Sequence, residues 1–315
     1  MTDLSIVIVN WNTRELLAGC LESLICEQSA VNSESQGLST VHGSLTTEVI
    51  VVDNASSDGS AAMVRECFPT VQVIENRENV GFARANNQAI CHSRGRYVLL
   101  LNSDTVVHAG ALETLVAFMD ARPQAGACGP RLLNGDGTLQ PSVFPMLTPI
   151  REFWQLSFFE RLYPRATYRV HDWDTTTARQ VDFIKGACFL VRRDAFHQIG
   201  LLDDRYFMYT EEVDLCYRLA QASWQLWYVP ASKVIHFGGA SSQQMREEMV
   251  IQLYRSKLQF YRRFGGVGRV RQARVLLTLA YVPRYMVASV AALIRPDWRS
   301  RARTYRRILA ELHGF

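Results

Sequence analysis

Residues 4–9 read LSIVIV, a short apolar run rich in β-branched residues that is typical of a buried parallel strand. Residues 13–26 then carry leucines at helical spacing, and this alternation of strand and helix continues for about 130 residues. Further strands are predicted at 48–52, 71–74, 97–101 and 126–129, and further helices at 59–68, 82–93 and 109–121. Alternation of this kind predicts βαβ units, and therefore an α/β fold with a Rossmann-like, mainly parallel sheet flanked by helices.

Polar residues stand where three of these strands end. Asn10 follows the first strand, Asp53 and Asn54 follow the second, and Asp104 follows the strand at 97–101. Ligands of parallel sheets bind beyond the carboxyl ends of the strands. Asn and Asp are also ordinary turn and capping residues, which is the structural alternative for each one alone. Their presence at three strand ends favours a ligand site.

The rest of the body is less regular. Residues 29–47 are polar and are predicted to form a surface loop, and residues 130–181 are irregular and rich in aromatic side chains. Beyond them the pattern predicts strands at 183–192, 226–229 and 234–239, and helices at 193–199 and 210–222.

The segment Asn102-Ser103-Asp104 has the composition of a cation site. A carboxylate just past a buried strand can reach a hard divalent cation, which prefers oxygen ligands and shares them with substrate phosphates. His236, which follows an apolar run, is a candidate further ligand. The alternatives are a turn in which Asp104 caps the next helix, and a histidine that is simply packed.

A second acidic cluster, Glu211-Glu212, follows an aromatic run at 206–209. A carboxylate beside apolar aromatic side chains has a raised pKa, which suits a general base. The structural alternative is that both side chains stabilise the first turn of a helix through its macrodipole. Asp214 and Arg218 have i,i+4 spacing and are interpreted as a structural pair.

Residues 78–87 read ENVGFARANN, the form of a turn that leads into a helix. Gly81 permits an unusual backbone angle or the close approach of a ligand, and the helix start can receive a phosphate or ribose oxygen. No GxGxxG follows the first strand and no GxxxxGK[ST] occurs in the sequence. The fingerprints of a dinucleotide-binding fold and of a P-loop are therefore absent from it.

Taken in order, these segments resemble the family 2 glycosyltransferases of GT-A fold, and within them the rhamnosyltransferase-like branch. The resemblance covers roughly residues 3–242. It is carried by IVIVNWN (6–12), VIVVDNASSDGS (49–60), ENVGFARANNQAI (78–90), YVLLLNSDT (97–105), GACFLVRRDAF (186–196), YFMYTEEVDLCYRL (206–219) and VPASKVIHFGGAS (229–241). Any one of these motifs is a weak signal, whereas the ordered set is specific.

The resemblance implies roles for individual positions. It places Asn10, Asp53, Asn54, Gly81, Phe82, Asn86 and Asn102 around the donor nucleotide and its sugar. Asn102-Ser103-Asp104 stands at the DxD-like metal motif, with Asp104 as the main ligand and His236 as a further one. Glu211-Glu212 stands where the family has Glu-Asp, so Glu212 is the expected base, and the longer side chain leaves Glu211 as the alternative.

The resemblance also implies a reaction. An inverting hexosyltransferase with Mg²⁺ or Mn²⁺ would move a sugar, rhamnose in this branch, from a nucleotide-diphosphate donor. The acceptor would be a glycan or a polyprenyl-linked glycan in cell-surface polysaccharide synthesis. Three alternatives remain open. The first is the same enzyme class with another donor, such as a UDP-hexose rather than dTDP-rhamnose. The second is a catalytically silent GT-A domain that only binds nucleotide sugar or glycan, and the third is a membrane-scaffold protein.

The net charge of +4 divides unevenly along the 315 residues. Residues 245–315 carry 15 basic and four acidic side chains, a net charge of +11, and residues 1–244 carry a net charge of −7. Together with the extent of the resemblance, this asymmetry predicts a GT-A glycosyltransferase domain over 1–244 and a basic amphipathic helical appendage over 245–315. A composition of 48% apolar residues excludes a disordered chain.

Within the appendage, residues 275–294 are apolar over about the length that spans a bilayer, but Pro283 and Arg284 interrupt them. Arginines flank the segment on both sides, which favours helices that lie against an anionic membrane surface. The alternative is an appendage that packs on the body or on a second copy of the chain in a homo-oligomer. No nucleic-acid-binding motif accompanies the charge, so no nucleic-acid partner is expected.

The seven cysteines are scattered, without CxxC spacing, and are expected to be buried reduced thiols. The N-terminal residues lack the pattern of a secretory signal. These features, together with the basic appendage, predict a cytoplasmic protein that is peripheral on the cytoplasmic face of the inner membrane.

Overall fold

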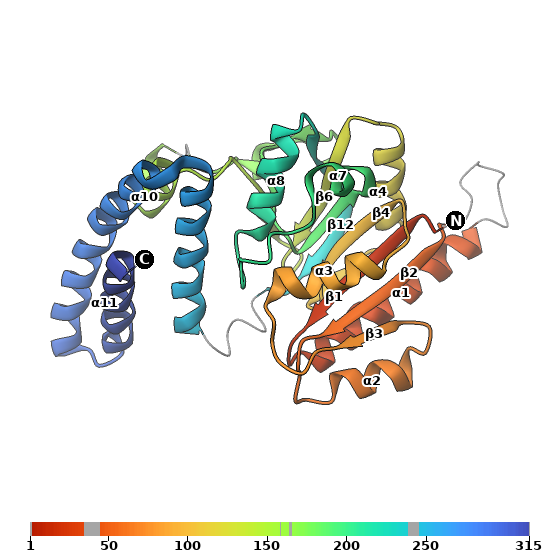
Figure 1. Ribbon diagram of the computed structural model, residues 1–315, viewed down its shortest axis with the longest axis horizontal. Helices are drawn as coiled ribbons and strands as arrows, with labels where there is room; N and C mark the ends of the chain where they lie inside the picture. The colour runs from red at the N-terminus through yellow and green to blue at the C-terminus, as the bar shows by residue number, and fades with distance from the viewer. Residues whose placement is uncertain (1, 35–44, 158, 164–165, 239–245, 315) are drawn as a thin grey trace. The chain divides into compact units, whose positions relative to one another are not determined.

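The computed structural model describes residues 2–34, 45–157, 159–163, 166–238 and 246–314 (Figure 1). The chain forms two compact units. The first unit comprises residues 1–144, 170–207 and 211–243, and the second comprises 145–169, 208–210 and 244–315. The C-terminal appendage therefore groups with two segments that lie before residue 245 in the sequence.

The first unit is built on a mixed sheet with the strand order β3-β2-β1-β4-β11-β6-β12-β5. Strands β3, β2, β1 and β4 are mutually parallel, and β11 runs antiparallel to both of its neighbours. The short strands β7 and β9 pair with β6 and β12, while β8 and β10 form a separate pair. The strands are β1 Leu4–Asn10, β2 Thr47–Asp53, β3 Gln72–Glu75, β4 Tyr97–Asn102, β5 Thr105–Val107, β6 Ala125–Leu133, β7 Leu139–Gln140, β8 Val143–Phe144, β9 Arg179–Gln180, β10 Phe183–Ile184, β11 Cys188–Arg192 and β12 Gln225–His236.

Helices flank this sheet (Figure 1). They are α1 Arg14–Glu34, α2 Ser60–Cys67, α3 Phe82–His92, α4 Ala111–Asp120, α7 Arg193–Ile199 and α8 Glu211–Gln221, with a 3-10 turn η1 at Val170–Asp172. Alternate residues of β1, such as Ile6 and Ile8, share a buried cluster with Leu17 and Leu21 of α1. These elements confirm the strand–helix alternation predicted from the sequence. The alternation is stable because the helices cover the apolar faces of the sheet.

The register of the parallel strands brings the predicted polar residues to one edge of the sheet. Asn10 stands opposite Asp53, and Asn102 stands opposite Val9 on the other side of β1. The ends of β1, β2 and β4 therefore meet at the same edge, as the sequence predicts.

Several predicted boundaries are wrong. The loop predicted at 29–47 begins as helix, because α1 continues to Glu34, and β2 begins at Thr47; its middle, 35–44, lies outside the described residues. The strand predicted at 183–192 is two strands, β10 and β11, separated by residues 185–187. Residues 226–229 and 234–239 were expected as two strands, but β12 runs through Pro230 to His236 with a shift of register against β6.

The second unit is helical. It contains α5 Pro149–Leu156, α6 Phe159–Leu162, α10 Arg246–Ile294 and α11 Trp298–Gly314. Helix α10 breaks at Gly266, where φ is 64° and ψ is −167°, so its two halves fold back as separate arms. The rings of Tyr254 and Tyr281 pack edge to face across these arms, and Tyr281 also packs on Tyr305 of α11. The half-buried Lys257 and the buried Glu152 form an ion pair at 2.7 Å that joins α10 to α5.

The cysteines are free thiols, as expected, but they are not all buried. Cys20, Cys128, Cys188 and Cys216 lie in the interior, whereas Cys26, Cys67 and Cys91 are exposed. Burial raises the pKa of the Cys20 thiol to about 12. A neutral thiol of this kind behaves as a small apolar side chain.

Candidate active site

Asn10 and Asp53 form a buried polar junction where β1 and β2 end. The Asn10 amide donates to Asp53 Oδ1 at 3.2 Å and to Ser56 Oγ at 3.2 Å, and Asn10 Oδ1 accepts from Thr13 Oγ1 at 2.6 Å. Asp53 Oδ2 accepts from the backbone N–H of Ser56 at 3.0 Å. Because Asn10 is fully buried and bonded on both sides of its amide, it holds the two strand-end loops in place.

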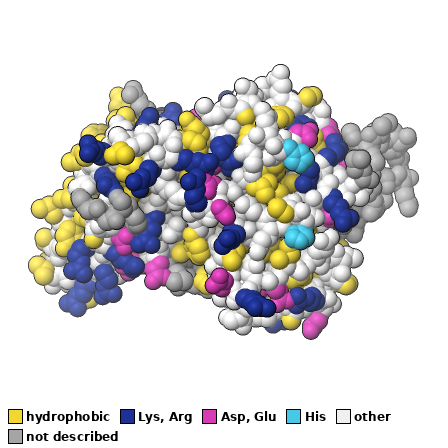
Figure 2. All heavy atoms as spheres, viewed as in Figure 1, with side chains coloured by type: hydrophobic (Ala, Val, Ile, Leu, Met, Phe, Trp, Pro, Cys, Tyr) yellow, Lys and Arg dark blue, Asp and Glu magenta, His cyan; other side chains and the backbone are white. Residues whose placement is uncertain are grey.

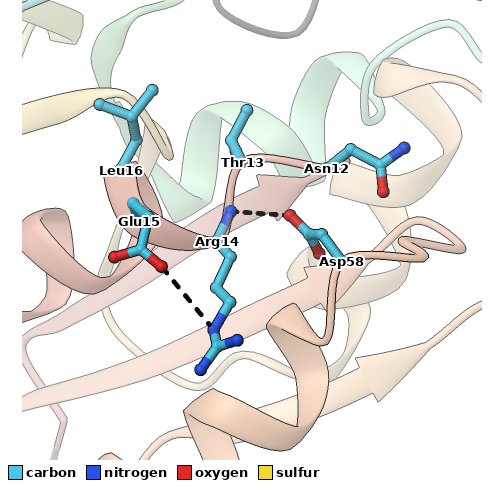
Figure 3. A pocket seen from close by; sticks show the side chains of 6 residues that line it. All are labelled: Asn12, Thr13, Arg14, Glu15, Leu16 and Asp58. Atoms are coloured by element: carbon cyan, nitrogen blue, oxygen red, sulfur yellow. Dashed lines mark hydrogen bonds and ion pairs between the residues drawn. The ribbon is translucent and has the colours of Figure 1, made fainter.

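An open pocket of about 420 Å³ lies at these same two loops (Figure 3). It is lined by Asn12, Thr13, Arg14, Glu15, Leu16 and Asp58. The backbone N–H of Arg14 donates to Asp58 Oδ2 at 2.9 Å, which joins the start of α1 to the loop before α2. Asn12 has a left-handed backbone, with φ of 52°, and its side-chain oxygen accepts from the Ser57 N–H at 2.7 Å.

Asn54 and Gly81 shape the next loop along the edge. The Asn54 amide donates to Asn79 Oδ1 at 2.8 Å, and its oxygen accepts from the Val80 N–H at 3.0 Å. Gly81 has φ of 87°, and a Cβ there would meet the Phe207 carbonyl oxygen at 2.6 Å. Only glycine fits, because the strained φ and the close approach both exclude a side chain.

Two more predicted donor-site residues belong to helix α3, which starts beside this loop. The backbone N–H of Phe82 donates to the Phe207 carbonyl at 2.6 Å. Asn86 is buried and donates to the Phe82 carbonyl at 2.9 Å. The amide of Asn86 is thus engaged within the helix, while the start of α3 is fixed against the 203–207 loop.

Asp104 and His236 come together from distant parts of the sequence. Asp104 lies in the turn between β4 and β5, and His236 ends β12 beside Thr105 of β5. Asp104 Oδ1 lies 3.3 Å from His236 Nε2, and both side chains are buried. Asn102 Nδ2 lies 3.3 Å from the same ring nitrogen.

Gln140 determines which nitrogen of His236 carries the proton. Its side-chain oxygen lies 2.6 Å from His236 Nδ1, and since an amide oxygen can only accept, Nδ1 is the donor. The amide nitrogen of Gln140 donates to the His236 carbonyl at 3.0 Å and to Asn134 Oδ1 at 2.8 Å. In the neutral ring, Nε2 therefore presents a lone pair toward Asp104.

This donor set fits a divalent cation. A carboxylate oxygen and a lone-pair nitrogen 3.3 Å apart match two neighbouring ligands of an octahedral ion, which lie about 3 Å apart. The second ring nitrogen is held by a hydrogen bond, as is usual for metal-ligating histidines. Within the described part of the chain, no group of three or more His, Cys, Asp or Glu side chains gathers as a metal site. Substrate phosphates and water would have to complete the coordination.

Glu211 and Glu212 begin α8 after two residues in left-handed backbone, Tyr209 (φ 67°) and Thr210 (φ 73°). Burial, followed by the neighbouring Glu212 carboxylate, raises the pKa of Glu211 well above its ordinary value. Glu211 is buried, whereas Glu212 is half-buried, with its Oε2 inside the protein.

Lys185 connects the candidate cation ligands, Asp104 and His236, to the acidic residues Glu211 and Glu212. It lies in the interruption between β10 and β11, with Nζ 3.3 Å from Gln140 Oε1. Burial lowers the pKa of Lys185, and the charges of Asp104 and Glu212 oppose this effect. Both carboxylates therefore act on one ammonium group. Glu212 also lies beside Gly186, where an added Cβ would come within 3.7 Å of the Glu212 Cβ.

Asp214 and Arg218 form the structural pair that their spacing predicts. Arg218 Nε donates to Asp214 Oδ1 at 2.6 Å, and the guanidinium also donates to the carbonyls of Ile199 and Leu201 at 2.8 and 2.7 Å. This pair anchors α8 to the segment before it.

Sequence reasoning missed Gln140, Lys185 and the pocket residues at 12–16 and 58. Gln140 carries no sequence signal, because it lies in an irregular region and only the fold brings it to His236. Lys185 inside a predicted apolar strand was a signal, since a lysine is rarely placed in an apolar strand without a partner for its charge.

Comparisons with known proteins identify the class. Residues 5–200 match the family described as "Glycosyl transferase family 2". Among solved structures, the chain is similar to the mannosyltransferase PcManGT from Pyrobaculum calidifontis in complex with GDP-Man and Mn²⁺, with a TM-score of 0.52, 18% identity and coverage of 98% of this chain and 85% of that one. It is also similar to GalNAc-T7 with UDP, GalNAc and Mn²⁺, with a TM-score of 0.53, 17% identity and coverage of 82% and 50%. The fold is that of the GT-A glycosyltransferases.

The chain belongs to the family 2 glycosyltransferases and is rhamnosyltransferase-like. It is 32% identical over 216 residues to the N-acetylglucosaminyl-diphospho-decaprenol L-rhamnosyltransferase of Mycobacterium tuberculosis, which covers 61% of this chain and 68% of that protein. It is 29% identical over 167 residues to the rhamnosyltransferase WbbL of Escherichia coli, which covers 50% of this chain and 61% of that protein. The resemblance drawn from the ordered motifs is confirmed.

Proposed function

We propose that this chain transfers a hexosyl residue, rhamnose, from a nucleotide-diphosphate donor to a glycan or polyprenyl-linked acceptor, with inversion at the anomeric carbon. The observation that carries the proposal is the convergence of Asp104 with His236 beside the strand ends of a GT-A sheet, with Glu212 next to Gly186 in the turn that also carries Lys185. The names of both rhamnosyltransferase relatives support the sugar, and the name of the Mycobacterium tuberculosis relative supports a polyprenyl-linked acceptor.

Glu212 is the proposed base. Glu212 takes the proton of an acceptor hydroxyl, and the acceptor oxygen attacks the anomeric carbon from the face opposite the diphosphate. The bond from that carbon to the diphosphate oxygen breaks, and the nucleoside diphosphate leaves with the electron pair. Glu211, whose raised pKa favours the neutral acid, adds no second charge beside the base.

Asp104 and His236 would hold the divalent cation, Mg²⁺ or Mn²⁺, and a bound cation would offset negative charge on the departing diphosphate. Gln140 keeps Nε2 of His236 unprotonated toward that position. Lys185 adds a positive charge in the same neighbourhood. The loops at Asp53 and the pocket at residues 12–16 would receive the nucleotide.

The test is Glu212→Gln, with Glu66→Gln on the exposed side of α2 as a matched control. We expect Glu212→Gln to lower kcat about 10²–10⁴-fold, because proton abstraction is lost, while calorimetric binding of the donor nucleotide is retained. Glu66→Gln should leave both unchanged. Normal turnover by Glu212→Gln would remove Glu212 from the role of base. NMR of the product anomer tests inversion.

The competing function is a silent GT-A domain that binds nucleotide sugar or glycan without transfer. The silent domain and the enzyme differ in one measurable property, the release of nucleoside diphosphate. If dTDP-rhamnose and UDP-hexoses bind but no nucleoside diphosphate is released with any lipid-linked or glycan acceptor, the silent domain is correct. Release with a UDP-hexose alone would keep the reaction and change the donor.

A further inference from the structure

One arm of helix α10 exposes an apolar face along its length. From Val275 to Leu293, large apolar side chains recur on the exposed side: Val275, Leu279, Val282, Met286, Val290 and Leu293, here called the apolar stripe. Their side chains are between 36% and 85% exposed. Their spacing of three and four residues places them on one side of the helix. The stripe is about 27 Å long, at 1.5 Å per residue.

The opposite side of the same arm is fully packed. Ala273, Leu277, Ala280 and Ala288 are buried, and Tyr281 lies against Tyr305 of α11. Arg284, the one charge between residues 275 and 294, points to this inner side, where it donates to the carbonyls of Ala280 and Leu156. The stripe is therefore apolar without interruption, although the helix as a whole is not.

A continuous exposed stripe of this size marks an interaction surface. By length and composition, Glu247–Ile294 is the one described helix that could cross a membrane, and its most apolar window is only 22% buried. The burial is too low for the core helix of a soluble protein. The inner side, however, packs on α11, whose arginines could not follow it into the hydrocarbon. A helix that lies in the membrane interface can place its exposed apolar side against lipid while its inner side stays packed on α11.

The charges near the apolar stripe indicate whether its partner is a second copy of the chain or an anionic lipid surface. Between residues 267 and 310 the sequence has ten arginines and one carboxylate, Asp297. Arg284 faces the inner side, and Arg295 and Arg307 are paired with Asp297 and Glu247, so seven arginines remain without a carboxylate partner among the ion pairs of the described residues. Arg269 and Arg271 precede the stripe, and exposed arginines of α11 follow it. Figure 2 shows hydrophobic and Lys or Arg side chains gathered near one another on this unit. A second copy of the chain laid on the stripe would bring these arginines against one another. Anionic lipid headgroups would instead neutralise them while the acyl region covers the stripe.

We propose that the apolar stripe of α10 docks in the plane of one leaflet of an anionic phospholipid membrane. This inference is independent of the transfer reaction, because it concerns a surface built entirely within the second unit. The stripe enters the boundary between headgroups and acyl chains, and the flanking arginines contact lipid phosphates.

The test is co-sedimentation of the full chain with vesicles of phosphatidylcholine mixed with phosphatidylglycerol, and with phosphatidylcholine alone. We expect binding to the mixed vesicles, weakened by salt. Leu279→Asp and Met286→Asp should each weaken it about tenfold or more, because an apolar side chain that enters the lipid on docking becomes a charge. Ile25→Asp, at an exposed position of α1, is the matched control and should bind as the unchanged chain does. Circular dichroism checks that the variants are folded.

Five results would overturn the proposal. The full chain could fail to bind the mixed vesicles, or bind phosphatidylcholine vesicles equally well. All three variants could bind alike. The chain could form a dimer in lipid-free buffer that Leu279→Asp dissociates, which would assign the stripe to a second copy. Bound protein could resist extraction by high salt and alkaline carbonate, which would indicate a spanning helix.

Discussion

Replacing Gln140 by leucine tests whether Gln140 sets the orientation and the tautomer of His236, which with Asp104 forms the candidate cation site. In the native protein, the oxygen of Gln140 holds the proton on Nδ1 of His236 at 2.6 Å, so Nε2 faces Asp104 with a lone pair. Leucine has a similar volume but no acceptor. The proton can then move to Nε2, and the ring loses the bond that orients it.

The expected size of the effect follows from what is lost and what remains. The variant loses the hydrogen bond to Nδ1 and the one to the His236 carbonyl at 3.0 Å, together with those to Asn134 and Lys185, whereas Asp104 stays in place. Loss of such a supporting partner weakens metal binding about 10–100-fold. This corresponds to about 1.4–2.8 kcal/mol in the free energy of binding.

The assay is titration of Mn²⁺ in the presence of dTDP, followed by electron paramagnetic resonance of the free ion. Gln140→Glu keeps an acceptor oxygen at the same position and should retain Mn²⁺ affinity. Gln124→Leu makes the same change at an exposed glutamine and should have no effect. If Gln140→Leu binds Mn²⁺ as tightly as the native chain, the argument from the tautomer of His236 is wrong.

Three further predictions concern stability, each measured by urea unfolding. Gly81→Ala should cost about 1–3 kcal/mol more than Gly137→Ala, because both have positive φ but only Gly81 faces a backbone oxygen, at 2.6 Å; equal costs would contradict the close approach. The raised pKa of Glu211 means that the native protein loses stability as pH rises from about 4.3 toward that pKa. Glu211→Gln should therefore gain stability relative to it over this range, and a pH-independent difference would refute the burial argument. Lys257→Met should destabilise the second unit by about 3–5 kcal/mol by leaving Glu152 buried and unpaired; adding Glu152→Leu should recover most of this, and no recovery would mean that packing dominates.

Much of the fold was predictable because its signals are local. The periodicity of apolar residues indicates which neighbours share one face of a strand or helix. The βαβ order, and the position of Asn10 and Asp53 at the same edge of the sheet, could therefore be predicted from the sequence. Boundaries were less predictable where the pattern was ambiguous. Residues 183–192 look like one apolar strand, but Lys185 and Gly186 turn out of the sheet, and α1 extends into polar residues that periodicity does not mark as helix.

The sequence by itself determined the family, the ordered motifs at the strand ends and the division of charge between body and appendage, because each is a property of residue order. Only the tertiary structure decided which side chains share a site. Gln140 reaches His236 across 96 residues, and Lys185 responds to both Asp104 and Glu212. It also decided that α10 buries one side and exposes the other. Periodicity shows only that apolar residues are present, whereas packing against α11 determines which of them lose contact with solvent.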